Sequence, residues 1–226
     1  MQNVSAQLPD TANKTVVAGP QYNRSRLHHF LWGSHYRKEW STPVTIKVFY
    51  LDTANGGLTA YDKGGSRQTM SLRLHDGQKR EYVLRSIDKS FTNALPELYR
   101  GTFVQSIIND QVSIAHPFAA VVVAPLAEKA GIYHTWPQNV FVPQQPSLGQ
   151  FSNKYGNKLY LFEQRPDGNW ETADNFGDAE KIIGTDKLFK KLAKDNDRTV
   201  DQVEYVRARL FDMFVGDWGR HEDQWR

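Results

Sequence analysis

Hydrophobic and polar residues follow two different periods along this chain, and the change of period separates strand-like from helix-like regions. The first apolar group stands at helical spacing among polar neighbours: Leu27, Phe30, Leu31 and Trp32. Gly33 follows directly. The spacing predicts a short amphipathic helix that ends at this glycine.

The next region has the period of β-strands. Apolar and polar residues alternate over 44–51, and Pro43 suits the start of a strand. Three more extended runs follow at 58–61, 68–74 and 81–87. They are separated by the turn-forming sequences Asp62-Lys63-Gly64-Gly65 and Asp76-Gly77, and Asn55-Gly56-Gly57 precedes the first of them. We expect an antiparallel meander of three or four strands.

From Leu95 the period becomes helical. Pro96 stands where a first-turn proline is tolerated, and apolar residues recur at helical spacing as far as Val112. This predicts a long helix after the sheet. His116-Pro117 interrupts it, and 118–130 predicts a second, apolar helix that Gly131 caps. Both helices are expected to be largely buried.

Two strand-like runs, 139–143 and 158–164, precede the strong breaker Arg165-Pro166-Asp167-Gly168, and we expect a hinge over 164–169. Thr185 can cap a helix through about residue 192. Thr199 and Gln202 form a capping box for a helix that Gly216 ends. The apolar residues of this last helix share one stripe, which predicts a buried face: Val203, Val206, Leu210 and Phe214.

These patterns predict an α+β fold with three parts. Residues 1–23 are polar and are expected to be a linker, 24–166 form a lobe with an antiparallel sheet and a long helix, and 167–226 begin a helical lobe. The chain ends at Gln224-Trp225-Arg226 without a turn or charged tail, which suggests that the second lobe is truncated.

Composition excludes several function classes. The formal net charge is only +3 and no run of five like charges occurs, so no nucleic-acid partner is expected. The chain has no cysteine, which excludes disulfides and thiolate zinc sites. No 18 consecutive residues are apolar, so we expect no membrane insertion by this segment. The seven histidines show no metal-ligand spacing, and no serine-hydrolase motif G-x-S-x-G occurs.

The polar loop after the last helix, 216–224, holds the most informative candidates. In atypical kinases, such as the phosphoinositide kinases and the secreted Golgi-type kinases, the corresponding turn resembles D-R-H-x-x-N/E, in which the Asp accepts the substrate hydroxyl proton. Here Arg220 and His221 match the R-H, and Gln224 falls at the metal-ligand position. Gly219 stands where the Asp is expected.

A carboxylate two positions away replaces such a base poorly, because a base must reach the hydroxyl within hydrogen-bond distance. Asp217 and Asp223 are the candidates to supply one. The alternative is a structural loop in which Arg220 and Asp217 cap the preceding helix. Gln224 would also be a weaker magnesium ligand than a carboxylate, since it brings no charge.

Candidates for nucleotide binding lie in the meander and at the hinge. Gly64-Gly65 could let backbone N–H groups approach phosphate oxygens, although an ordinary turn has the same sequence. Arg85, in Tyr82-Val83-Leu84-Arg85, occupies the place of the phosphate-pairing lysine of kinases, but an exposed strand arginine is an equal alternative.

The remaining kinase parts are an acid and a hinge. Glu97 and Asp110 are both candidates for the acid that pairs with the phosphate-binding side chain, and the sequence does not choose between them. The backbone at Glu163 and Gln164 is where an adenine would dock.

Several stretches together resemble one family of large cell-envelope proteins typical of the Bacteroidetes. They are Leu27-His28-His29-Phe30-Leu31-Trp32-Gly33, His35-Tyr36-Arg37-Lys38-Glu39-Trp40, Ser71-Leu72-Arg73-Leu74, Tyr82-Val83-Leu84-Arg85-Ser86 and the region from Arg209-Leu210-Phe211-Asp212 through Gln224-Trp225. In such proteins a calcineurin-like metallophosphoesterase domain often precedes this region and an outer-membrane β-barrel often follows. The family's loop usually reads D-W-D-R-H-E-D-Q-W, so Gly219 departs from it as well as from kinases.

The resemblance implies a cell-envelope location, periplasmic or associated with the outer membrane, and other domains of the same full-length protein as partners. We expect a protein-kinase-like fold with ATP and Mg²⁺ as its cofactors. With Gly219 at the base position, we expect a degenerate or truncated phosphotransferase, a pseudokinase that acts as a scaffold or weak nucleotide-binding module. The alternatives are an active ATP-dependent kinase in the full-length chain and a segment without chemistry in a metallophosphoesterase-named protein.

Overall fold

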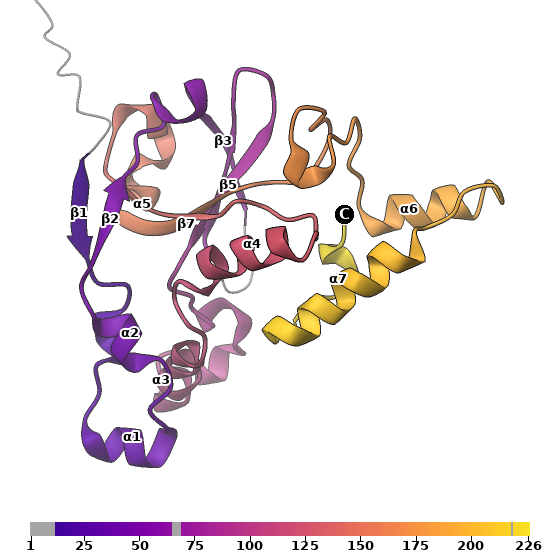
Figure 1. Cartoon of the computed structure of the whole chain (residues 1–226). Coiled ribbons are helices and arrows are strands. Elements are labelled where there is room, and N and C mark those ends of the chain that lie inside the picture. Colours follow the sequence, from indigo (N-terminus) through magenta and orange to yellow (C-terminus); the bar gives the residue numbers. More distant parts are fainter. Residues whose placement is uncertain (1–11, 65–68, 218) are drawn as a thin grey trace, which may run out of the picture. The chain divides into compact units, whose positions relative to one another are not determined.

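The computed structural model describes residues 12–64, 69–217 and 219–226, without the side chains of Asn93 and Asp223. The chain divides into two compact units (Figure 1). The first comprises residues up to Ala119 together with Gln138–Phe162, and the second comprises Ala120–Pro137 together with Glu163–Arg226. The boundary in β7 lies close to the expected hinge, but 120–137 belongs to the second unit, whereas the sequence placed it in the first lobe.

The first unit is built on a seven-stranded, mostly antiparallel sheet with the strand order β1-β2-β6-β7-β5-β4-β3 (Figure 1). The parallel pair is β2 with β6. The α+β class is therefore confirmed. The strands are β1 (Asn13–Val16), β2 (Val44–Val48), β3 (Thr59–Gly64), β4 (Ser71–His75), β5 (Glu81–Ser86), β6 (Gln138–Val142) and β7 (Lys158–Gln164).

The meander expected from the alternating pattern is confirmed as β3, β4 and β5, which pair antiparallel in succession. The turn expected at 62–65 was wrong in its position, because β3 continues through Gly64. Gly64 is required there: a Cβ would lie only 2.6 Å from Ser71 Oγ on the neighbouring strand. The turn at Asp76-Gly77 is confirmed, since Asp76 Oδ1 accepts hydrogen bonds from the backbone N–H groups of Gln78 and Arg80.

The helices α1, α2 and α3 gather at one end of this sheet (Figure 1). The short helix expected before Gly33 is confirmed as α1, with Ser25 Oγ accepting from His28 N at its start and Gly33 at φ 86° after its end. The α-helices of this unit are α1 (Arg26–Trp32), α2 (Arg37–Ser41), α3 (Phe103–Asp110) and α5 (Ser152–Tyr155). The 3-10 turns are Pro20–Tyr22, Ala54–Gly56, Thr92–Ala94, Glu97–Tyr99, Gln111–Ile114 and Pro146–Phe151.

The long helix expected from Leu95 was wrong. The segment instead forms the 3-10 turn Glu97–Tyr99, then α3, which has eight residues, and then the 3-10 turn Gln111–Ile114. The break has a local cause: Gly101 takes φ 76° and Thr102 is extended, so the helical path cannot continue through them. The burial expected for this segment was also wrong, because Leu98 and Phe103 are 80% and 76% exposed.

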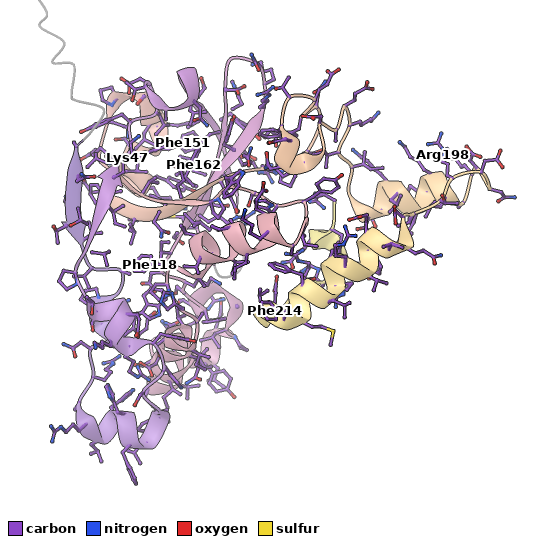
Figure 2. All side chains as sticks on the ribbon, in the orientation of Figure 1. Lys47, Phe118, Phe151, Phe162, Arg198 and Phe214 are labelled. Carbon is purple, nitrogen blue, oxygen red and sulfur yellow. The ribbon has the colours of Figure 1, made fainter. Side chains whose placement is uncertain are left out.

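The expected linker at 1–23 differs from the structure in its second half. Residues 1–11 lie outside the described residues, but β1 pairs with β2, and Tyr22 is buried against Trp40 with ring centroids 4.9 Å apart. Tyr22, Trp40, Ile87 and Val112 form one core cluster under the sheet. A second group of aromatic contacts joins Phe162 (Figure 2) to Phe49 and Tyr82.

The second unit is mainly helical. Its elements are α4 (Ala119–Lys129), the 3-10 turn Asp174–Phe176, α6 (Thr185–Leu192), α7 (Gln202–Val215) and the 3-10 turn Glu222–Gln224. Trp170 is buried and packs edge-on against Phe176. The helix ends expected at Gly131 and Gly216 are confirmed, both with positive φ.

Three expectations for these helices were wrong. α7 is capped by Asp201, whose Oδ1 accepts from the N–H groups of Val203 and Glu204, and not by a box from Thr199. The apolar stripe of α7 is exposed rather than buried: its four residues, including Phe214 (Figure 2), have 52–77% of their surface accessible. In α4 only Ala124 and Ala127 are buried, so its expected burial was wrong as well.

One stretch of the described residues, Phe103–Lys129, is long and apolar enough to pass a test for a membrane span. Length and composition are the only grounds for this assignment, and a single stretch of this kind is weak support for a membrane span. In the folded chain this stretch is divided between α3, a 3-10 turn and α4, and α4 contains Pro125.

Candidate functional site

The loop after α7 begins with a glycine cap. Gly216 adopts φ 74° and ψ 25°, and its N–H donates to the carbonyl oxygens at the end of the helix. Asp217 N then donates to Asp212 O at 2.8 Å. These bonds satisfy carbonyl groups that the helix leaves open and reverse the chain direction, which brings the loop back toward α7.

A buried carboxylate holds the returning loop. Asp212 of α7 is only 2% exposed, and it lies 3.0 Å from Arg209 Nη1 and 3.3 Å from Arg220 Nη1. Arg220 Nε also lies 3.4 Å from Asp217 Oδ2. The guanidinium groups of both arginines stack near the ring of Trp225, at 5.6 and 5.2 Å from its centroid. Arg220 therefore joins the loop, α7 and the following segment.

The charges around Asp212 oppose one another. Burial raises the pKa of the Asp212 carboxyl most, and Asp217 raises it further. Arg220 and Arg209 lower it only in part, so the pKa stays above its ordinary value. A buried carboxylate with two arginine partners and a second acid beside it is an arrangement that active sites share with structural ion-pair networks. Since Arg220 and Asp217 contact each other and Asp212, their contacts match the structural alternative for this loop.

Position 219 is open in this loop. A Cβ on Gly219 would meet only Asp217 Oδ1, at 3.8 Å, which is an ordinary contact distance. The φ angle of Gly219 lies outside the left-handed region, so the backbone does not require glycine. The loop could therefore carry an aspartate at the position where a kinase has its base.

The other predicted residues of this loop lie in or beside the 3-10 turn Glu222–Gln224. His221 is exposed and precedes the turn, with its carbonyl accepting from Gln224 N at 3.0 Å. The Gln224 side chain is exposed, and the side chain of Asp223 lies outside the described residues. Thr185 Oγ1 donates to Glu222 O at 2.7 Å, which ties the turn to the start of α6.

Two residues predicted for phosphate binding stand in one row of the sheet. Gly64 on β3 is opposite Ser71 on β4, and Ser71 is opposite Arg85 on β5. Adjacent strands are about 4.8 Å apart, so the backbones of Gly64 and Arg85 are about 10 Å apart in the row. Directly opposed residues point to the same face. Arg85 is exposed, and Gly65 lies outside the described residues.

At the end of β7, side chains tie the predicted hinge to its own unit. Gln164 Oε1 accepts from Asn175 Nδ2 at 3.0 Å and from Trp136 N at 3.1 Å. Thr135 Oγ1 donates to Glu163 Oε2 at 3.4 Å. These side chains have structural partners, so only the backbone of Glu163 and Gln164 is a candidate for base docking.

The two candidate acids have different partners. Glu97 is 3.9 Å from Arg100 on its own 3-10 turn. Asp110, at the end of α3, forms a bidentate ion pair with Arg37 of α2. Arg37 Nη1 donates to Asp110 Oδ1 at 2.7 Å, and Nη2 donates to Oδ2 at 2.5 Å. His28 Nε2 is 3.1 Å from Asp110 Oδ2, and Arg24 Nε is 3.6 Å from Oδ1. Asp110 is thus the centre of a buried polar cluster.

This cluster perturbs the acid strongly. Burial alone would raise the pKa of Asp110, but hydrogen bonds from Arg37 and His28 outweigh burial and bring the pKa to about 2. Arg37 is 1% exposed and also donates from Nε to the carbonyl of Gly33. The sequence analysis named Asp110 but not Arg37 as a site residue, because 73 positions separate the two in the chain.

A cleft of about 440 Å³ opens beside this cluster. Eleven of its twelve lining residues carry polar side chains, and the twelfth is Gly101. The charged ones are Arg24, Asp88, Lys89 and Asp110. The sequence analysis did not find this cleft, because its walls come from the segment before α1, the end of β5 and the segment that includes α3.

Asp88 is the carboxylate with spare capacity in the cleft. Tyr22 Oη donates to Asp88 Oδ1 and Gln21 Nε2 donates to Oδ2, both at 2.8 Å. Although much of the residue is exposed, local burial of its carboxyl raises the pKa of Asp88, and the bonds from Tyr22, Lys89 N and Gln21 lower it in part.

Within the described residues, no group of three or more His, Asp or Glu side chains is placed to hold a metal ion. Among the described carboxylates, Asp217 lies nearest to position 219, and it is paired with Arg220. No family model, no curated protein and no solved structure matches this chain. Its function is therefore inferred from its own residues.

Proposed function

We propose that this chain is a kinase-like module of a cell-envelope protein that no longer transfers phosphate and acts as a scaffold or weak nucleotide-binding domain. The order of the elements supports the kinase-like part. A three-stranded meander is followed by α3 and α4, then by β6 and β7, then by a break at 165–168 and two further helices, α6 and α7. A small lobe, a hinge and the start of a helical lobe have that order, apart from 120–137, which belongs to the second unit.

The loop after α7 is the observation that carries the proposal. It is anchored on the buried Asp212 through Arg220, yet it has glycine at the position of the base. In phosphoryl transfer, the protein contributes mainly positioning and charge stabilisation, and the base orients the nucleophile. A loop that keeps its anchor but lacks the carboxylate is suited to binding and not to turnover.

The row of Gly64, Ser71 and Arg85 supports weak nucleotide binding. A guanidinium can hold phosphate oxygens with two parallel hydrogen bonds, so Arg85 carries this part of the proposal, whereas Ser71 Oγ fills the space beside the backbone of Gly64. ATP is the proposed ligand of this row. Separately, Gln224 in the loop after α7 is the candidate Mg²⁺ ligand. Because Gln224 brings no charge, we expect metal binding to be weak.

The exposed stripe of α7 favours the scaffold role. Its four apolar side chains are 52–77% exposed in this chain. Exposed apolar surface of this kind marks interaction sites. We propose that other domains of the same full-length protein contact it.

The decisive variant is Gly219→Asp, because a Cβ at position 219 meets no atom of the described residues closer than 3.8 Å apart from its chain neighbours. We expect no ATP turnover by the wild-type chain and a gain of about 10²-fold over background for Gly219→Asp, since a positioned base contributes 10²–10⁴-fold. Gly219→Asn is the matched control, with the same shape and no basic group. Phosphate release is measured with ATP and Mg²⁺.

Binding is tested separately from turnover. Millimolar ATP with Mg²⁺ should shift thermal denaturation only slightly, because a ligand at its Kd stabilises by about 0.4 kcal/mol. Amide NMR signals near Arg85 should nevertheless move, and Arg85→Ala should abolish that change. Turnover by the wild-type chain would contradict the loss of activity. No ATP-dependent change in either the wild type or Gly219→Asp would contradict the kinase-like assignment.

A further inference from the structure

We propose that the polar cleft of the first unit is a binding site for a neutral polyhydroxylated ligand, a short saccharide. This site lies wholly in the first unit, and the inference goes beyond the proposed kinase-like function and does not depend on it. The lining, the charge balance and the remaining hydrogen-bond capacity of the cleft each restrict the ligand.

The lining restricts the ligand to a polar molecule. Small-molecule pockets are usually lined by hydrophobic and aromatic side chains with a few polar groups. Here every lining side chain is polar, and three amides and four hydroxyls stand among the charged groups. The carbon atoms of these side chains also line the cleft, so a ligand that fills the volume of about 440 Å³ must offer both hydrogen-bonding groups and C–H surface.

Charges of both signs in the cleft favour a neutral ligand. The cleft contains two cationic side chains, Arg24 and Lys89, and two carboxylates, Asp88 and Asp110, of which Asp110 is already paired with the buried Arg37. A free phosphate or a nucleotide would meet the carboxylates, and a polyamine would meet the cations. A neutral molecule with many hydroxyl groups can donate to carboxylates and accept from cations without a net charge mismatch.

The existing hydrogen bonds show which groups remain to bind it. Asp110 is occupied by Arg37, His28 and Arg24. Asp88 accepts from Tyr22, Gln21 and the backbone of Lys89, which leaves acceptor capacity, because a carboxylate has about four acceptor sites. We assign Asp88 as the main acceptor for ligand hydroxyls and Lys89 Nζ as the main donor.

The cleft also limits the affinity. Tyr22 provides the single aromatic ring among its lining residues, and this ring is 3% exposed and packed on Trp40. No ring in the lining is therefore available to stack on a sugar face. Hydrogen bonds to ligands in an open cleft replace bonds to water, so their net contribution is small. We expect dissociation constants in the millimolar range.

The test is saturation-transfer NMR on the whole chain with a panel of neutral probes: glucose, galactose, mannose, N-acetylglucosamine, maltose and cellobiose. Ser106→Met places a longer side chain in the cleft wall without removing a hydrogen bond that the structure shows for the Ser106 side chain. Ser34→Met is the matched control, an exposed serine outside the cleft. Circular dichroism melts establish that both variants remain folded.

We expect at least one saccharide to give saturation transfer that Ser106→Met weakens at least tenfold and Ser34→Met leaves unchanged. Lys89→Met should weaken binding of the same saccharide. The proposal would be overturned if none of the six saccharides gave saturation transfer at about 50 mM. This concentration is roughly the weakest dissociation constant that hydrogen bonds alone would give. Binding that Ser106→Met does not affect, or displacement of the saccharide by equimolar phosphate or ATP, would also overturn it. Saccharide binding should be the same in Arg85→Ala, even where that variant loses ATP binding. Failure of this inference and failure of the proposed function are therefore distinguishable.

Discussion

Replacing Asp110 by asparagine tests the buried cluster that positions α1, α2 and α3. The change removes the negative charge while keeping the shape, and it leaves the guanidinium of Arg37, which is 1% exposed, without its ion-pair partner. Breaking a buried pair from one side costs about 3–5 kcal/mol, because an uncompensated charge remains buried. We expect Asp110→Asn to lower the free energy of unfolding by an amount in this range.

The pKa gives an independent magnitude. The pKa of Asp110 is about 2, against 3.8 for an ordinary aspartate. One pKa unit corresponds to about 1.4 kcal/mol, so ionisation of Asp110 in the folded chain contributes about 2 kcal/mol. Because the folded pKa is lowered, this contribution is fully present above pH of about 4 to 5 and is lost as the pH falls through about 2.

The assay is urea denaturation from pH 7 to pH 2, followed by circular dichroism. The wild type should lose stability steeply below pH 5, and Asp110→Asn should show a shallower loss. Asp52→Asn, at an exposed aspartate of the same unit, is the matched control and should change stability by less than about 0.5 kcal/mol. A loss below about 1 kcal/mol for Asp110→Asn, with the acid slope of the wild type, would refute the reasoning.

Two further variants test local features of the structure. Gly177→Ala should destabilise the second unit by more than about 1 kcal/mol, because φ is 66° and a Cβ would lie 2.7 Å from Tyr133 Oη. Thermal melts measure this loss. Gly101→Ala is the control for backbone strain alone, since Gly101 has φ 76° and a Cβ there would meet no atom within 4 Å. Asp212→Asn should lower the melting temperature and change the NMR signal of the Trp225 indole, because Arg209 and Arg220 lose their shared carboxylate; an unchanged indole signal would contradict this anchoring role.

Features that depend on neighbouring residues could be predicted from the sequence. The start and end of α1 follow from Ser25 and Gly33, and the meander follows from alternation and the turn at Asp76. The wrong prediction of a long helix from Leu95 also has a local cause. The helical spacing of apolar residues favoured a helix, but Gly101 adopts a left-handed backbone conformation that ends the helical path.

Features that depend on distant partners could not be predicted. The spacing of Val203, Val206 and Leu210 identifies one face of α7, but it does not say whether anything in the chain covers that face. The sequence also named Asp110 as a candidate acid without its partner Arg37, and it missed Asp88, because their contacts join segments about 70 positions apart. The role of the loop residues in phosphate chemistry stays a prediction.

The loop at Gly219 shows how the proposed kinase-like domain would keep its fold without a base at this position. Its anchor is the contact of Arg220 with Asp212, and its turn is the glycine cap at Gly216. Neither feature uses the side chain at position 219, where a Cβ would touch only Asp217 Oδ1. A change from aspartate to glycine there would remove a base without breaking a structural contact of the described residues. The side chain at position 219 can therefore change without loss of this anchor, which is what the proposed kinase-like module would need in order to persist as a binding domain.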